Sequence, residues 1–257
     1  MQYGYFDDAS REYVITNPKT PVKWINYIGT LSFGGFVDHT GGILVCKGDP
    51  ALNRITKYIP QLPASDFKGS TIYIRIRDEQ GTHIFSPFFT PTLDPIDRFE
   101  CRVGLGYTTW LTELYGVRTE VTTFIPLGVE QLIQTIAVTN LREDTPEIAV
   151  IPTVEFTHFD ALKQFTNADW IPQTMTCRAL DLAETDGYTT LVQYAFMLRD
   201  VRHNFFTSNV PAASYETDRA RFLGDNEYGT WADPLSLYDT LSSEDSVRGD
   251  NIAAPVS

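Results

Sequence analysis

The sequence is poor in positive charge. Its 257 residues include 20 Lys and Arg against 33 Asp and Glu, which gives a formal net charge of −13. No segment gathers basic residues into a stripe of the kind that binds the phosphates of DNA or RNA. We therefore expect no nucleic-acid partner.

Cysteines and long apolar runs are also scarce. Cys46, Cys101 and Cys177 lie far apart without a CxxC spacing, which favours reduced, buried thiols over a disulfide framework. No run of about 18 apolar residues is present to span a membrane. The first residues lack the basic and apolar regions of a secretory signal. These features predict a cytoplasmic location and no membrane association.

Motifs for a complete catalytic site are missing. The four histidines are scattered singly: His39, His83, His158 and His203. A zinc site needs three or four ligands at workable spacing. Neither G-x-S-x-G nor GxxxxGK[ST] occurs, and no spacing singles out two acids for glycoside chemistry. We predict no catalytic residue, no metal site and no cofactor in this chain.

Alternating apolar residues are abundant and predict β-strands. In residues 70–85, Ile72, Ile74 and Ile76 alternate with more polar neighbours, which indicates a hairpin with one buried and one solvent-exposed face. The neighbours assigned to the exposed face are Tyr73, Arg75 and Arg77. Residues 107–128 repeat the hairpin pattern, and residues 130–156 indicate a third hairpin around the polar turn 141–146. With weak helical signals, the chain is expected to be all-β, a large antiparallel β-sandwich.

The composition changes towards the C-terminus. Residues 215–257 contain nine acidic residues against three arginines, and hydrophobic alternation stops. We predict a sandwich domain over residues 1–214. Residues 215–257 are predicted to be an acidic, irregular continuation of the same domain, without a closing strand or capped helix. On this interpretation the last strands of the sandwich are missing.

Residues 152–175, PTVEFTHFDALKQFTNADWIPQTM, begin as a strand and then lose the alternation. Asp160 is a candidate N-cap for a short helix. Aromatic faces beside amides and carboxylates suit sugars, because ring C–H groups stack while hydroxyls find polar partners. The candidate sugar-binding residues are His158, Gln164, Phe165, Asn167, Asp169 and Trp170. A buried strand-end histidine and a tryptophan that anchors the loop remain alternatives for His158 and Trp170.

Seven segments spread over nearly the whole chain carry a family resemblance. They are residues 3–29, 48–58, 102–108, 124–128, 138–140, 154–156 and 217–224. In this order they resemble the cellobiose and chitobiose phosphorylases of glycoside hydrolase family 94, formerly glycosyltransferase family 36. In the last segment, TDRARFLG, we interpret Arg219 and Arg221 as structural residues that pair with acids of the same segment.

The resemblance implies a galactose-mutarotase-like super-sandwich, which the family follows with a helical linker and an (α/α)6 barrel. It also implies cleavage of a β-linked disaccharide or oligosaccharide by inorganic phosphate, with inversion to an α-sugar 1-phosphate. The general acid of the family lies in the barrel. We therefore expect this chain to lack the barrel, to be inactive alone, and to have that barrel as a partner.

The family also implies a homodimer in which a loop of the sandwich reaches the partner's barrel and shapes the acceptor site. By order along the chain, that loop is residues 157–175. Trp170 stands where cellobiose-type members have an arginine, and KYIPQLP at 57–63 replaces RYRYNN. The acceptor could then be an aldonic acid, a longer oligoglucan or another hexose. The alternatives are a stand-alone carbohydrate-binding module and an inactive truncated fragment.

Overall fold

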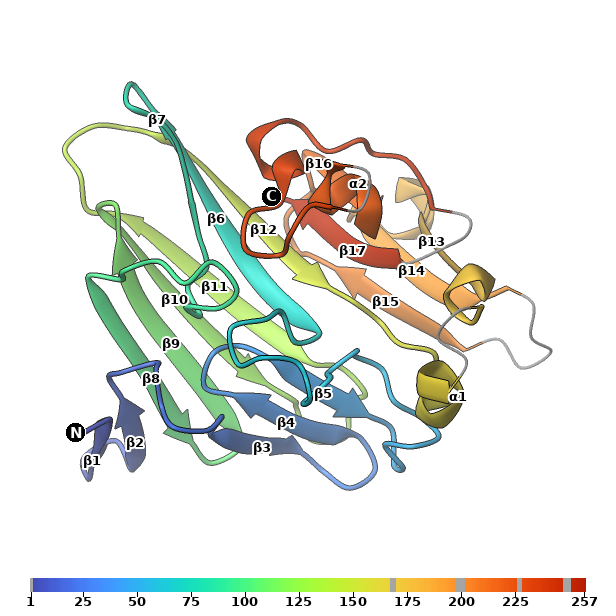
Figure 1. Cartoon of the computed structure of the whole chain (residues 1–257), viewed down its shortest axis with the longest axis horizontal. Coiled ribbons are helices and arrows are strands. Elements are labelled where there is room, and N and C mark those ends of the chain that lie inside the picture. The colour runs from blue at the N-terminus through green and yellow to red at the C-terminus, as the bar shows by residue number, and fades with distance from the viewer. Residues whose placement is uncertain (1, 167–169, 197–201, 226–227, 247–250) are drawn as a thin grey trace.

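Four antiparallel sheets make up the chain in a computed structural model that describes residues 2–166, 170–196, 202–225, 228–246 and 251–257 (Figure 1). The largest has the order β1 (Gly4–Asp7), β2 (Glu12–Ile15), β8 (Arg98–Gly104), β9 (Tyr107–Leu114), β10 (Val117–Phe124) and β11 (Ile133–Asn140). The second has the order β16 (Ser214–Asp218), β17 (Asn251–Val256), β12 (Glu147–Val154), β6 (Ser70–Asp78) and β7 (Gly81–Phe85). The predicted all-β antiparallel class is confirmed.

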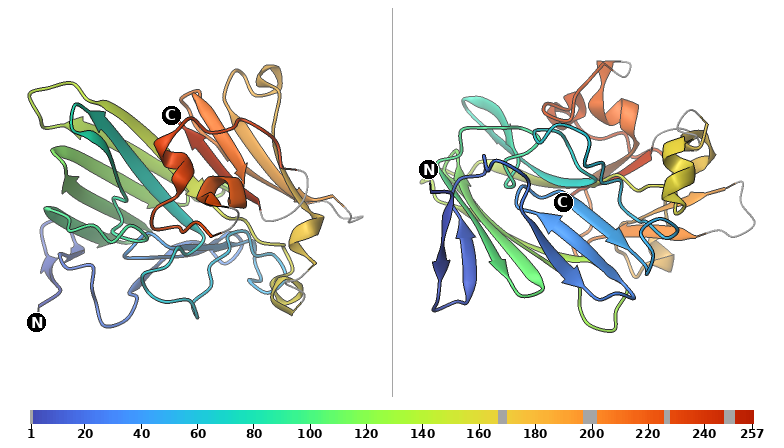
Figure 2. Two further views of the ribbon diagram at one scale, coloured as in Figure 1. Left: turned by 45° about the horizontal axis from the view of Figure 1, so that its top comes forward. Right: turned by 60° about the horizontal axis from the view of Figure 1, so that its bottom comes forward.

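Two three-stranded sheets flank the large ones (Figures 1 and 2). One contains β3 (Ile25–Gly29), β4 (Gly34–Asp38) and β5 (Ile43–Cys46), and the other β13 (Met175–Ala179), β14 (Thr190–Ala195) and β15 (His203–Thr207). The short helices are α1 (Ala161–Thr166), α2 (Arg219–Leu223), η1 (Pro172–Thr174), η2 (Leu182–Glu184) and η4 (Leu235–Tyr238). Each described helix is too short to cross a membrane.

The main core lies between the two large sheets. Ile72, Ile74 and Ile76 of β6 are fully buried and belong to the same apolar cluster as Trp110 of β9 and Val121 of β10. Period-2 alternation places such residues on one face of a strand, and burial of that face stabilises the pairing. The two predicted hairpins, β6–β7 and β9–β10, are both present.

The prediction that β6 has one solvent-exposed face is wrong. Tyr73 and Arg75 are buried as well, because the segment that carries α2 and η4 packs over them. The Tyr73 hydroxyl donates a hydrogen bond to the Trp231 carbonyl at 2.7 Å, and Arg75 donates to the Leu237 carbonyl at 3.0 Å. A face covered by irregular chain leaves no signal in the alternation of the strand itself.

The predicted third hairpin is also wrong. β11 pairs with β10 in the first large sheet, whereas β12 pairs with β6 in the second. Residues 141–146 therefore cross from one sheet to the other instead of closing a hairpin. Arg142 in this crossover is 2.6 Å from both Asp78 and Asp144, so the polar segment is held at the end of β6.

The C-terminal segment is more regular than its composition predicts. β17 lies between β16 and β12, and all six of its residues are buried. A strand buried on both faces shows no alternation. α2 is capped as well, since the Asp218 carboxylate accepts a hydrogen bond from the Arg221 amide at 3.0 Å. The expectation of no closing strand or capped helix is therefore wrong, while the boundary at residue 214 stays a prediction.

Candidate functional site: the loop after β12

The base of the loop is tied to the segment that follows β5. Phe156 forms a bridge with Thr56, and the Thr157 amide donates to the Ile55 carbonyl at 2.9 Å. One residue pair further, the Arg54 amide donates to the Phe159 carbonyl at 3.1 Å. These backbone contacts fix the direction in which the chain leaves β12.

A short helix follows, as predicted. The Asp160 carboxylate accepts a hydrogen bond from the Lys163 amide at 2.8 Å, so Asp160 is the N-cap of α1. The Ala161 amide donates to the Ala51 carbonyl at 2.8 Å, and the Ala161 side chain is buried. The start of α1 is therefore docked on the body of the protein.

His158 lies inside the base of the loop, with 1% of its surface exposed. Its Nδ1 accepts a hydrogen bond from the Asp160 amide at 3.1 Å, and its ring stacks on Phe159 with 4.3 Å between centroids. Burial lowers the pKa of His158 below its ordinary value. This is the geometry of the strand-end histidine, and it places the imidazole behind the loop surface.

Arg202, which the sequence did not single out, lies just before β15 and contacts the residues at the base of the loop. Its guanidinium lies 4.4 Å from the centroid of the Phe159 ring, a cation–π distance. It also donates to the Leu52 carbonyl at 3.3 Å and to the Asn53 side-chain oxygen. Arg202 is far from the loop in sequence and belongs to no motif, so no pattern could have identified it.

Trp170 is a predicted site residue whose side chain is open to solvent. It is 47% exposed, while its neighbour Ile171 is buried. The Trp170 carbonyl accepts a hydrogen bond from the Gln173 amide at 3.1 Å, at the start of η1. The backbone is thus anchored while the indole meets solvent.

The other predicted residues cannot be placed in full. Asn167 and Asp169 lie outside the described residues. Gln164 and Phe165 belong to α1, but their side chains are outside the described part of the chain. His158 and Trp170 are therefore the two predicted site residues whose side chains the structure describes.

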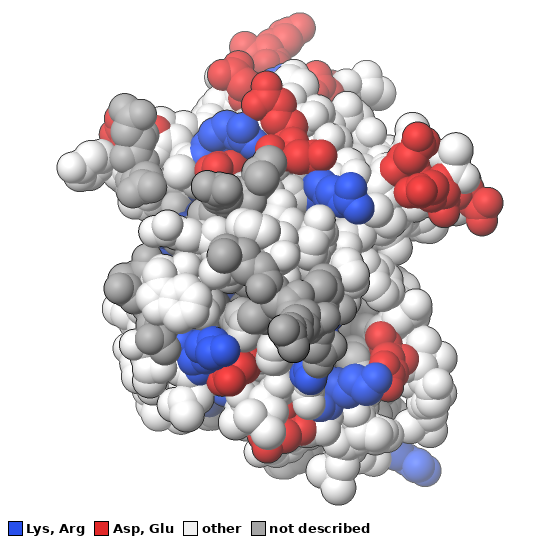
Figure 3. Space-filling view, turned by 90° about the vertical axis from the view of Figure 1, so that its right-hand side faces the viewer, with Lys and Arg blue, Asp and Glu red and all other residues white. Residues whose placement is uncertain are grey.

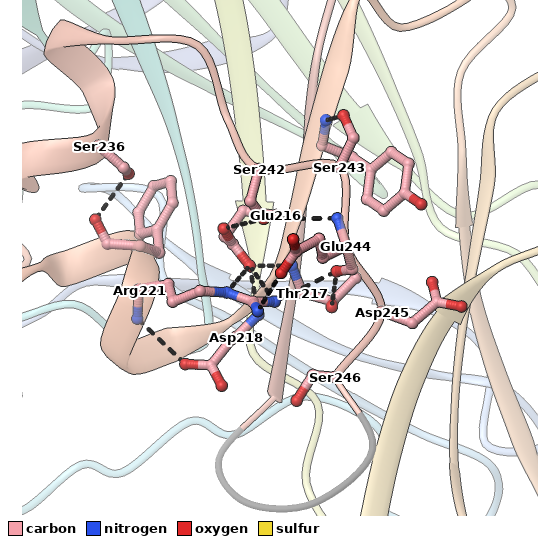
Figure 4. Close-up of polar contacts among 12 residues, drawn as sticks. Glu216, Thr217, Asp218, Arg221, Ser236, Ser242, Ser243, Glu244, Asp245 and Ser246 are labelled. Carbon is pink, nitrogen blue, oxygen red and sulfur yellow. Dashed lines mark hydrogen bonds and ion pairs between the residues drawn. The ribbon is translucent and has the colours of Figure 1, made fainter.

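The TDRARFLG segment builds a buried polar network around Glu216 (Figure 4). One Glu216 carboxylate oxygen accepts from the Thr217 and Asp218 amides, both at 2.9 Å, and from Arg221 at 3.1 Å. The other accepts from the Ser242 hydroxyl at 2.6 Å. Arg221 therefore pairs with Glu216, which directly precedes the segment, and with Glu244, so these acidic partners lie outside residues 217–224 and not within them as predicted.

Arg219 behaves differently from Arg221. Its guanidinium is 3.9 Å from the carboxylate of Glu155, an acid at the end of β12 rather than one of its own segment. Glu155 also binds Lys57 at 2.6 Å. Arg219 thus connects α2 to the strand from which the candidate loop departs.

The surface around the loop has mixed charge. Figure 3 shows the face that carries α1, where Lys and Arg side chains occur in small groups beside Asp and Glu and form no continuous basic area outside the grey atoms. Among the described residues, no three His, Cys, Asp or Glu side chains gather in a metal-binding arrangement. On this face, polar side chains can form hydrogen bonds with a ligand and the exposed Trp170 ring can stack on one.

Acid should destabilise the protein partly through His158. Because burial lowers the pKa of His158 in the folded state below the 6.5 of an ordinary histidine, the unfolded chain binds this proton more readily. Its stabilising contribution is present above pH 6.5 and is lost as the pH falls. Between pH 7 and pH 5.5, the free energy of unfolding measured with urea should decrease less for His158→Gln than for the unmodified chain. His203→Gln, which changes an exposed histidine, is the control, and an equal loss in all three proteins would contradict the prediction.

Comparison with known proteins places these features in a family. Residues 11–256 match the family model described as glycosyl hydrolase 94, supersandwich domain. The chain is 29% identical over 242 residues to an N,N'-diacetylchitobiose phosphorylase of Vibrio proteolyticus, covering 92% of this chain and 29% of that protein. It is 28% identical over 239 residues to a solabiose phosphorylase of Paenibacillus borealis, covering 91% and 29%.

A third relative is named for another disaccharide, one that contains a glucuronide. It is a 3-O-beta-D-glucopyranosyl-beta-D-glucuronide phosphorylase of Paenibacillus borealis, 25% identical over 236 residues that cover 88% of this chain and 27% of the relative. The chain thus spans less than a third of the length of these relatives. All three names share one chemistry, phosphorolysis, and differ in the disaccharide.

Proposed function

The chain belongs to the glycosyl hydrolase 94 family through its supersandwich domain, and from this membership we propose that it serves as the N-terminal domain of an inverting β-disaccharide phosphorylase. The family match over residues 11–256 is the observation that carries the proposal. The relatives that share the domain are phosphorylases with different disaccharides in their names. The domain would bind carbohydrate at its loop and support a homodimer.

In the proposed reaction, inorganic phosphate is a co-substrate. Phosphate attacks the anomeric carbon from the face opposite the leaving sugar, while a general acid protonates the glycosidic oxygen. A single displacement inverts the anomeric centre and releases an α-sugar 1-phosphate. The acid and the phosphate-binding residues would come from a barrel domain, so the 257-residue chain by itself is expected to be inactive.

The proposed role of residues 157–175 is to shape the acceptor site. The exposed Trp170 indole would stack on the acceptor sugar, and Gln164, Asn167 and Asp169 would bind its hydroxyls. His158 and the Phe159–Arg202 contact would hold the loop from behind. An indole in place of the arginine expected for cellobiose-type members favours an acceptor other than glucose, such as an aldonic acid or another hexose.

The cysteines fit a reducing, cytoplasmic compartment. Cys46, Cys101 and Cys177 are free and buried, and burial raises the pKa of the Cys101 and Cys177 thiols. Thiols in this state are unreactive and form no disulfide framework.

The proposal is tested with the full-length gene product, inorganic phosphate and a panel of β-linked disaccharides. Accumulation of a sugar 1-phosphate with one of them is expected, and its α-configuration would establish inversion. Absence of product with every substrate would refute the proposal. Calorimetric titration of the 257-residue chain with the same sugars then decides whether the domain is a stand-alone carbohydrate-binding module, which would bind saturably without catalysis.

Trp170→Ala in the full-length enzyme should raise the acceptor KM in the synthetic direction about fivefold, because an aromatic contact of this kind is worth roughly 1 kcal/mol. The KM for the sugar 1-phosphate should change little, since the loop would not touch phosphate. Tyr27→Ala, which removes an exposed ring on β3, is the matched control. Unaltered acceptor kinetics in Trp170→Ala would assign the indole no role in the acceptor site.

A further inference from the structure

A groove of about 1380 Å³ opens between strands that belong to different sheets. Residues of β11, β12, β14 and β15 line it, together with the segment that follows β5. β11 is the last strand of the first large sheet and β15 the last of its three-stranded sheet, so each has an open edge in the described part of the chain. The volume exceeds the range of about 300–1000 Å³ for a site that holds one small molecule. The groove therefore has room for a ligand of several rings.

The described lining of the groove is about half polar. Its polar side chains are mostly amides and hydroxyls, and the one acid among them, Glu130, pairs with Lys47 at 2.7 Å. The apolar half includes five phenylalanines: Phe33, Phe156, Phe159, Phe205 and Phe206. Rings combined with uncharged hydrogen-bonding groups suit a sugar, because its C–H faces stack on the rings while its hydroxyls find polar partners.

Two polar side chains of the lining are buried and have hydrogen-bonding capacity to spare. Gln193 of β14 is 1% exposed, and its one hydrogen bond to a described residue is accepted from the Asn204 side chain at 3.1 Å, whereas an amide can form up to four. Thr157 is also 1% exposed, and its hydroxyl has no partner among the described residues. Buried polar groups are nearly always paired in native proteins. A ligand rich in hydroxyl groups would supply the missing partners.

A ring lies beside the amide pair of Gln193 and Asn204. Phe206 is two residues from Asn204 on β15, and Gln193 lies opposite Asn204 on β14, so the three side chains share one face of the sheet. Phe206 is half-buried, and Phe205, on the other face of this edge strand, is 49% exposed. The groove thus offers ring surface next to hydrogen-bonding groups, which is the arrangement that a chain of sugar rings requires.

The groove is separate from the surface at Trp170. Of the predicted acceptor loop, its described lining includes only Thr157, Phe159 and Met175, which lie at the two ends of that loop. The exposed Trp170 indole is not among the described lining residues. A ligand in the groove would therefore contact the sheets and the base of the loop rather than the exposed ring.

We propose that the groove is a second saccharide site, which binds an uncharged oligosaccharide longer than a disaccharide and is distinct from the loop surface at Trp170. Sugar rings lie against Phe205 and Phe206, and sugar hydroxyls bond to the amides of Gln193 and Asn204. The inference concerns binding and does not depend on the phosphorylase reaction.

The test is calorimetric titration of the 257-residue chain, without phosphate, with cellobiose, cellotetraose, N,N'-diacetylchitobiose and its tetrasaccharide homologue. At least one tetrasaccharide should bind saturably and at least about tenfold more tightly than its disaccharide, because the additional rings form further contacts in the groove. No saturable binding of either tetrasaccharide, or no gain over the disaccharides, would overturn the proposal. Since phosphate is absent, this outcome is independent of the proposed reaction.

Gln193→Met tests the amide in the groove. It keeps a side chain of similar size, and it should weaken binding of the tetrasaccharide about fivefold, the effect of losing one or two hydrogen bonds. Gln80→Met, in an exposed turn outside the groove, is the matched control and should bind as tightly as the unmodified chain. Urea unfolding of both variants shows whether the fold is retained. Equal affinities of the two variants, both folded, would contradict the proposal.

Phe205→Ala tests the same groove at an exposed position, where truncation should have little effect on stability. Binding should again weaken about fivefold, through the loss of ring stacking. Trp170→Ala should leave the affinity unchanged, because the indole lies outside the groove. Loss of binding in Trp170→Ala, with unchanged binding in Phe205→Ala, would place the sugar on the loop and overturn the proposal.

Discussion

Trp110→Ala is expected to lower the free energy of unfolding by about 4 kcal/mol, the range for truncation of a large buried aromatic side chain. Trp110 is fully buried in the centre of the core, where its ring packs edge-on against Phe88 with 4.8 Å between centroids. Its indole N–H donates to the His39 carbonyl at 2.8 Å. The substitution therefore leaves a cavity and a buried carbonyl without its donor. Urea denaturation at constant m-value measures the change.

The exposed Trp170 provides the control for this result. Trp170→Ala should change the free energy of unfolding by no more than about 0.5 kcal/mol, because the side chain is 47% exposed. Trp110→Phe keeps most of the ring but not the N–H donor, so an intermediate loss of about 1–2 kcal/mol is expected. Equal effects at Trp110 and Trp170 would show that the two large sheets do not share the core described above.

Glu216→Ala is expected to lower the free energy of unfolding by about 3 kcal/mol. The carboxylate is 2% exposed and accepts bonds from the Thr217 and Asp218 amides, from Arg221 and from Ser242. Removing it leaves buried donors unpaired and takes an anionic partner from a guanidinium, and such losses exceed the worth of the contacts themselves. Thermal and urea unfolding should agree on the size of the effect.

Glu244→Ala is the matched control, since Glu244 binds the same guanidinium at 2.9 Å but is 69% exposed. Solvent screening makes such a pair worth at most about 1 kcal/mol. Because both acids bind Arg221 and differ in exposure, the difference between the two variants measures how much burial adds to the stabilising effect of the ion pair. A Glu216→Ala protein as stable as Glu244→Ala would show that the TDRARFLG network does not fasten α2 to β16.

The candidate site illustrates which local features a sequence reports. Asp160 as helix cap followed from a short polar side chain before DALKQF, because capping depends only on neighbouring residues. The departure of the loop from the strand after Phe156 followed from the lost alternation. The support from Arg202 had no such signal, because its contact with Phe159 is made by packing between distant segments.

The sequence alone determined the all-β class, the two hairpins and the family, because these depend on alternation and on motifs that are read along the chain. The tertiary structure decided which sheet each strand joins. In it, β11 and β12 belong to different sheets, Tyr73 and Arg75 are buried under α2 and η4, and β17 lies between β16 and β12. Pairing partners lie far apart in sequence, and the free energy of burying both faces of a strand arises only when those partners meet. The open edge of β11 belongs to the same class of information, since an edge is defined by the absence of a neighbour in the described sheet rather than by any residue of the strand.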